Sequence, residues 1–92
     1  MTITKDKSKL QGQLQAAQFA LRSRDFVTAE KELSQALKTA RQSFGESSSH
    51  TAVILSELAE CYEAQGKETE ADECYRQVRN ILTHRRTRRA SQ

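Results

Sequence analysis

The chain has 92 residues, of which 36% are hydrophobic and 29% charged, and its formal net charge is +3. This length fits a single domain with a modest core. No apolar run approaches the roughly 18 residues that a membrane-spanning helix needs. The first residues also lack the apolar core of a secretory signal, so we expect a cytoplasmic protein. Pro is absent and only three Gly occur, which favours helix throughout.

The first half of the chain predicts two amphipathic helices. Apolar residues recur every three or four positions, at Leu10, Leu14, Ala17 and Leu21 and again at Phe26, Ala29, Leu33, Ala36, Leu37, Ala40 and Phe44. Between these two runs Ser23-Arg24-Asp25 forms a break, with Asp25 as the expected N-cap of the second helix. Because the break is short, the two helices should form an antiparallel hairpin over about residues 9–43.

The second half predicts another pair of helices, over about residues 50–83. Its apolar positions are Leu55, Leu58, Ala59 and Tyr62, followed by Ala71, Tyr75, Val78 and Leu82. Gly45 should stop the preceding helix, the serines after it should cap the next one, and Gly66 is the expected left-handed C-cap between the two helices. Residues 1–8 are expected to form a flexible N-terminus and residues 84–92 a basic tail.

A shift of 42 residues superimposes the two halves on each other. Ala17 then falls on Ala59 and Ala29 on Ala71. Side chains of methyl size at a helix crossing allow a close approach, while larger residues one turn away fill the flanks. The sequence therefore predicts the same tightly packed hairpin twice.

The second half carries a family resemblance. The segment Leu58-Ala59-Glu60-Cys61-Tyr62, with Gln65-Gly66-Lys67 and Glu70-Ala71 after it, resembles the tetratricopeptide repeat (TPR) family, and in particular its long-loop subtype from kinesin light chains. The resemblance implies an all-α fold of two antiparallel helical hairpins, stacked as a short right-handed superhelix over residues 9–83. The first half departs from the pattern at Arg24, which stands where the family usually has Gly.

The resemblance also implies a function. Proteins of this family bind peptides or partner proteins in a concave groove, so we expect an adaptor, an assembly factor or a regulatory subunit. Carried over by register, the groove would be lined by Gln11, Leu14, Gln15, Gln18, Leu21, Arg22, Val53, Ser56, Glu57, Glu60 and Glu63.

The charge of this lining indicates the chemistry of the partner. The subgroup that grips chaperone carboxylates uses Lys, Asn and Arg at places where this chain has Leu14, Gln18, Ser56 and Glu60. A carboxylate would be repelled by Glu60, so a basic segment is the expected ligand. The alternative is that Glu57, Glu60 and Glu63 form only a solvated face.

Two repeats are few for an independent fold, because each hairpin buries its apolar face against a neighbour. We therefore expect a homodimer or an obligate complex, with Phe44, Ile54, Ile81 or Leu82 partly exposed at the outer edges. Cys61 and Cys74 are expected as small buried hydrophobes, with a disulfide within the hairpin as the alternative.

Charge is segregated along the chain: residues 1–43 carry +4, residues 44–75 carry −7, and residues 76–92 carry +6. The basic tail suggests an alternative function, in which a helical protein binds nucleic acid or an anionic surface. The tail has no aromatic residue to stack on bases, so nucleic acid is the less favoured partner. Arg88-Arg89-Ala90-Ser91 resembles a basophilic kinase site, which makes Ser91 a candidate for phosphorylation.

No motif indicates an enzyme. His50 and His84 lie in a linker and in the tail, without partners at catalytic spacing. Phosphate-binding loops, nucleophile elbows and metal-ligand motifs are missing as well. We expect no catalytic activity, no metal and no cofactor.

Overall fold

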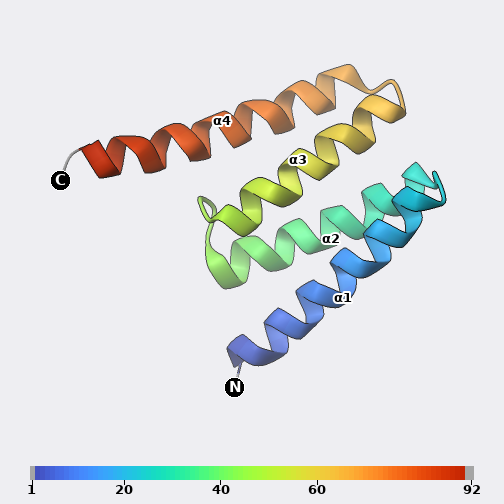
Figure 1. The fold of residues 1–92 in the computed structure, drawn as a ribbon, viewed down its shortest axis with the longest axis horizontal. Coiled ribbons are helices and arrows are strands. Elements are labelled where there is room, and N and C mark those ends of the chain that lie inside the picture. The colour runs from blue at the N-terminus through green and yellow to red at the C-terminus, as the bar shows by residue number, and fades with distance from the viewer. Residues whose placement is uncertain (1, 91–92) are drawn as a thin grey trace.

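The computed structural model describes the backbone of residues 2–90 and the side chains of residues 7–83. Its four helices are α1 (Thr2–Arg22), α2 (Phe26–Phe44), α3 (Ser49–Ala64) and α4 (Glu68–Ala90). They follow one another in space in chain order, each antiparallel to the last, and form a body only 16 Å thick (Figure 1). The part of the chain that is described contains no strand. The predicted all-α fold of two helical hairpins is confirmed.

Helix α1 begins at Thr2, earlier than the hairpin boundary expected near residue 9. Neither Gly nor Pro occurs before Gly12, so nothing in the sequence stops a helix from running through this segment. The helical backbone therefore covers most of the segment expected to be flexible. At the other end, α4 continues to Ala90, through most of the segment expected to be a tail.

The two hairpin turns have the same geometry. In the second, the amide of Gly66 donates to the carbonyl of Glu63 and the amide of Lys67 to that of Tyr62, while Gly66 has φ 78°. This is a Schellman motif, in which a left-handed residue closes the helix. In the first, Arg24 and Asp25 make the equivalent bonds, to Leu21 and Ala20.

The predicted caps are present. The Asp25 side chain accepts a hydrogen bond from the Thr28 amide at 3.2 Å and begins α2. Gly45, with φ 99°, ends α2. Ser48 begins α3 by accepting from the Thr51 amide at 3.1 Å, and the Thr51 hydroxyl donates to the carbonyl of Gly45 at 2.8 Å. The connection between the hairpins is thus held by its own polar groups.

The repeated alanines lie at the centre of the core. Ala17, Ala29 and Ala59 are fully buried, and Ala71 is 1% exposed. Because the four positions are equivalent in pairs, each hairpin uses the same close helix contact. The prediction made from the internal repeat is confirmed.

The edges of the core differ from expectation at several positions. Ile54 and Ile81 are buried, so their predicted exposure is wrong: the other hairpin covers Ile54, which lies on the middle helix α3. Leu82 is 52% exposed, as expected. Phe19, on α1, is 72% exposed and was not anticipated.

Candidate functional site

Helices α1 and α3 enclose a small groove with mostly apolar walls. It has a volume of about 270 Å³ and is lined by Leu10, Leu14, Ser49, His50, Val53 and Ile54. Val53 is 57% exposed, so its side chain is accessible on the groove wall. An apolar wall with a few polar groups is the kind of surface on which an apolar side chain of a ligand can be buried.

The structure brings together only part of the lining predicted from sequence. Leu14 and Val53 line the α1–α3 groove. The other predicted residues lie on the surfaces of α1 and α3: Leu21, Ser56 and Glu57 are half-buried, whereas Gln11, Gln15, Gln18, Arg22, Glu60 and Glu63 are exposed. The Ser56 hydroxyl donates to the carbonyl of Ala52 at 3.1 Å, one turn earlier in the same helix.

The carboxylates of α3 form an acidic stripe that consists of Glu57, Glu60 and Glu63. Burial raises the pKa of Glu57, and the nearby charge of Glu60 raises this pKa further. Glu63 accepts a hydrogen bond from the Tyr75 hydroxyl of α4 at 3.0 Å. This bond, together with the negative charges of Glu63 and Glu60, raises the pKa of Tyr75. The stripe is therefore a region of concentrated negative charge.

Sequence reasoning missed four groove residues: Leu10, Ser49, His50 and Ile54. His50 stacks on the Phe44 ring, with ring centroids 4.0 Å apart and planes at 10°. The sequence contains a signal for this contact, because Phe44 and His50 lie at the two ends of the short connection between α2 and α3. The spacing of the two residues alone does not fix how the linker folds.

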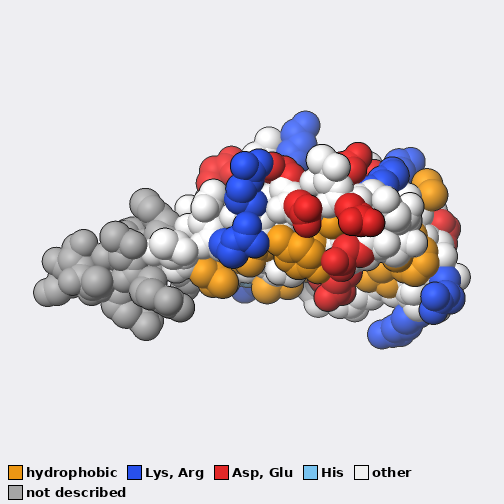
Figure 2. All heavy atoms as spheres, turned by 90° about the horizontal axis from the view of Figure 1, so that it is seen from above, with side chains coloured by type: hydrophobic (Ala, Val, Ile, Leu, Met, Phe, Trp, Pro, Cys, Tyr) orange, Lys and Arg blue, Asp and Glu red, His pale blue; other side chains and the backbone are white. Residues whose placement is uncertain are grey.

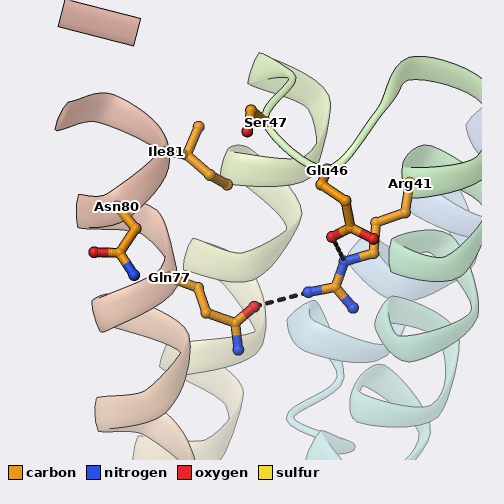
Figure 3. A pocket seen from close by; sticks show the side chains of 6 residues that line it. All are labelled: Arg41, Glu46, Ser47, Gln77, Asn80 and Ile81. Atoms are coloured by element: carbon orange, nitrogen blue, oxygen red, sulfur yellow. Dashed lines mark hydrogen bonds and ion pairs between the residues drawn. The ribbon is translucent and has the colours of Figure 1, made fainter. Parts of the chain in front are cut away.

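A second surface lies between α2 and α4, where Arg41 connects the hairpins (Figure 3). Its Nη2 donates to Oε1 of Gln77 at 2.7 Å, and its Nε lies 2.9 Å from Oε1 of Glu46. On one side of this bridge is a hollow of about 300 Å³ whose walls include Asn80 and Ile81. The bridge joins two helices that are not neighbours in the chain.

On the other side of the bridge lies a larger groove of about 550 Å³, the α2–α4 groove. Its lining includes apolar side chains of three helices, namely Leu37, Leu55, Leu58, Tyr62 and Cys74. Glu70 and Glu73 also line it. This groove does not contain any residue predicted from the sequence to bind a partner.

Groups that could perform chemistry are few in the described residues. Cys61 and Cys74 are buried and free, as expected, and burial raises the pKa of each thiol. The Cys61 thiol donates to the carbonyl of Phe26 at 3.0 Å and so serves the packing of α2 on α3. Over the described part of the chain, no cluster of His, Cys, Asp or Glu could hold a metal ion. Ser91 lies outside the described residues.

None of the described helices is both long enough and apolar enough to cross a membrane.

A comparison with protein families identifies the repeat. The family model for the tetratricopeptide repeat matches residues 9–84, which is most of the chain. The chain belongs to the tetratricopeptide repeat family. TPR repeats generally act as protein–protein interaction modules, and the family is in general not catalytic. Searches among curated proteins and among solved structures gave no significant match.

Proposed function

We propose that this TPR protein is a non-catalytic interaction module, acting as an adaptor, an assembly factor or a regulatory subunit. It binds a peptide segment of a partner protein along α1 and α3. The observation that carries this proposal is the position of the acidic stripe relative to the α1–α3 groove. Val53 in the groove and Glu57 in the stripe are one helical turn apart on α3, so about 6 Å separates the apolar and acidic parts of the surface.

This arrangement favours a partner that combines an apolar side chain with Lys or Arg. The apolar side chain would lie against Leu14 and Val53 in the groove. The cation would approach Glu57 and Glu60, whose ionised forms repel each other in the free protein. Binding a cation relieves that repulsion, which gives the basic segment an advantage over a neutral one.

Other parts of the proposal follow from the sequence. The chain is of the long-loop, kinesin-light-chain-like subtype, and it is cytoplasmic. Its functional unit is the two-repeat domain of residues 9–83, with the segments before and after it as accessories. The domain pairs with a second copy to form a homodimer, because two repeats leave apolar surface uncovered at the edges.

A binding experiment with defined peptides tests the ligand class. The probes are short fluorescein-labelled peptides with one Leu and two Lys at varied spacing, and the same peptides with Glu in place of Lys. Fluorescence anisotropy should show binding of the Lys series only. Reversal of Glu57, Glu60 and Glu63 to Lys should weaken this binding by at least about tenfold, since about 1.4 kcal/mol of attraction is lost.

The matched control reverses three carboxylates on other surfaces, Glu32, Glu70 and Glu73, which changes the net charge equally. This control should retain binding. Equal loss in both triple variants would mean that the peptide responds only to net charge, and unchanged affinity in the stripe variant would refute the proposed site. A titration with duplex DNA at two salt concentrations tests the alternative function, because phosphate binding falls steeply with salt.

A further inference from the structure

Helices α1 and α4 lie at opposite edges of the molecule, and each has a face that none of the described helices covers (Figure 1). Figure 2, which views the molecule from the α4 side, shows hydrophobic side chains exposed beside carboxylates. Two of the face residues, Gln13 and Tyr75, are half-buried and the others are exposed. The α1 face consists of Gly12, Gln13, Ala16, Phe19 and Ser23, and the α4 face of Glu68, Asp72, Tyr75, Arg79 and Leu82.

The internal repeat shows that these faces are the two halves of one interface. At the equivalent positions inside the chain, the Cys61 thiol donates to the carbonyl of Phe26 at 3.0 Å, and Gln65 donates to Glu30 at 2.9 Å. There α3 packs on α2. Under the shift of 42 residues, the α1 face corresponds to Ile54, Leu55, Leu58, Cys61 and Gln65 of α3, and the α4 face to Phe26, Glu30, Leu33, Leu37 and Ala40 of α2.

The contacts between α2 and α3 also set the register. These helices are antiparallel, with Phe26 bonded to Cys61 near one end and the carbonyl of Gly45 bonded to Thr51 near the other. The pairs that come level between these ends are Leu33 with Leu58, Leu37 with Leu55, and Ala40 with Ile54. Their counterparts at an interface between two copies are Tyr75 with Ala16, Arg79 with Gln13, and Leu82 with Gly12.

Tyr75 and Ala16 compensate each other in size. They correspond to Leu33 and Leu58, which are both buried inside the chain. The α4 residue is larger than its counterpart and the α1 residue is smaller, so the pair keeps a similar total volume. The hydroxyl of Tyr75 remains bonded to Glu63 at 3.0 Å, and the accessible side of the ring is left for Ala16 of the next copy.

Leu82 and Gly12 show the same exchange of volume. They correspond to Ala40 and Ile54, which are both buried. A Cβ built at Gly12 meets no atom within 4 Å, so the space that Ile54 fills in α3 is open at Gly12 and can receive Leu82. Two unrelated faces would have no reason to change size in opposite directions at both positions. The compensation therefore assigns the two faces to each other.

Arg79 and Gln13 exchange polarity on both sides at once. Their counterparts Leu37 and Leu55 line the same apolar groove inside the chain. The side-chain oxygen of Gln13 is buried and has no hydrogen-bond partner among the described residues, which is unfavourable for an acceptor. The Arg79 guanidinium of a second copy supplies a donor once the amide of Gln13 turns toward the face.

We propose that copies of this chain associate head to tail, with the α4 face of one copy packed on the α1 face of the next. This inference rests on the self-association proposed above and assigns its surfaces. Because the two faces differ, the first product is a dimer with one free face at each end, and further copies add as the concentration rises.

One pair makes the contact between copies weaker than the contact inside the chain. Lys67 lies 3.3 Å from Glu30 across the internal interface. The residues at the equivalent positions are Asp25 and Asp72, which have the same charge and repel each other. We therefore expect reversible association that depends on concentration.

Two variants that each block one face test the assignment. Ala16→Glu blocks the α1 face and Leu82→Asp blocks the α4 face; both residues are exposed, so circular dichroism should show an unchanged fold. Sedimentation equilibrium should find that the average mass of the wild type rises beyond that of a dimer at high micromolar concentration. Each variant alone should stay monomeric, and their equimolar mixture should form a dimer that does not grow, because only one intact interface can form.

Matched controls carry the same change of charge on the same helices. Gln18→Glu on α1 and Asn80→Asp on α4 alter exposed residues outside the two faces, and both variants should assemble as the wild type does. An α1–α1 contact would leave Leu82→Asp dimeric, and an α4–α4 contact would leave Ala16→Glu dimeric, so either result would overturn the head-to-tail arrangement.

The polar pair gives a second measurement. Arg79→Leu removes the donor and Gln13→Leu removes the acceptor, so each should raise the dissociation constant between copies by about tenfold. The double variant rebuilds the pair that Leu37 and Leu55 form inside the chain, and it should recover the affinity of the wild type. A double variant as weak as the single variants would refute the pairing.

These experiments separate the interface from the rest of the proposal. A monomeric wild type at high micromolar concentration would refute both the self-association and its surfaces. A dimer that does not grow, or that survives in both face-blocking variants, would refute only the head-to-tail contact. Ala16 and Leu82 lie outside the acidic stripe and the α1–α3 groove, so binding of the Lys peptides by these variants tests the proposed function independently.

Discussion

Arg24 occupies in the first hairpin turn the left-handed backbone position that Gly66 occupies in the second. Its φ is 60° and that of Gly66 is 78°, and each residue is followed by an amide that closes the same hydrogen bond. A side chain in this region brings Cβ close to the following carbonyl, which Gly avoids. The two turns therefore have one geometry, with backbone strain only at Arg24.

The strain at Arg24 predicts that Arg24→Gly stabilises the protein. We expect a gain of about 0.5–1 kcal/mol in the free energy of unfolding, measured by urea denaturation. The Arg24 guanidinium lies 5.8 Å from the centre of the Phe26 ring, and losing this contact offsets part of the gain. Arg24→Ala removes the guanidinium but keeps a side chain at positive φ, so it should show no gain. Equal stabilisation by both variants would contradict the explanation.

Gly66→Ala should have the opposite effect. A Cβ at Gly66 meets no atom within 4 Å, so the only cost is the left-handed backbone. We expect a loss of about 1–2 kcal/mol. Gly12→Ala is the matched control: its Cβ also meets no atom within 4 Å, but Gly12 lies within α1 at ordinary helical φ, and Ala there should stabilise. If Gly66→Ala left the free energy of unfolding unchanged, the turn would have changed its backbone conformation, contrary to this prediction.

The core alanines should not tolerate larger side chains. Ala17 and Ala59 have no exposed surface, so Leu at either position forces the helices apart and should cost about 1–3 kcal/mol. Ala64→Leu, at an exposed position of α3, is the control and should be close to neutral. Thermal unfolding followed by circular dichroism measures all three variants. A neutral Ala59→Leu would show that the helices are not in close contact there.

The bridge between Arg41 and Gln77 should couple the hairpins energetically. A double-mutant cycle with Arg41→Ala and Gln77→Ala should give a coupling energy of about 0.5–1.5 kcal/mol, because the hydrogen bond is charge-assisted and partly buried. The ion pair of Arg41 with Glu46 is the comparison, since the Glu46 side chain is 77% exposed. Its coupling should be smaller, and should fall as salt rises. No coupling in the first cycle would mean that the bridge does not form in solution.

Glu57 should make stability depend on pH. Burial and the charge of Glu60 raise its pKa in the folded state above the ordinary value of 4.5, so the folded protein binds a proton more tightly than the unfolded chain. This contribution is fully present below pH 4.5 and is lost as the pH rises through the raised pKa. Glu57→Gln should therefore be more stable than the wild type at pH 7, with the difference shrinking at pH 4. Urea denaturation at both pH values measures this. A difference that grows on acidification would contradict the assignment.

Fold class and repeat could be predicted because the information for them is local. Apolar spacing predicts the four helices. Asp25 and Gly66 mark turns through their own backbone chemistry, and the small residues at Ala17 and Ala59 indicate a close helix contact. The groove residues Leu10, Ser49 and His50 could not be found in this way, because their proximity depends on how one hairpin stacks on the other.

By itself the sequence determined a pair of equivalent helical hairpins and the acidic-to-basic order of charges along the last helix. Both are properties of residues close together in the chain, where helical periodicity fixes which side chains share a face. The tertiary structure alone decided which faces remain open. Ile54 and Phe19 are both apolar residues on the first helix of a hairpin, but a neighbouring hairpin covers Ile54 and leaves Phe19 exposed. Burial depends on contacts between segments distant in sequence, which no local pattern specifies.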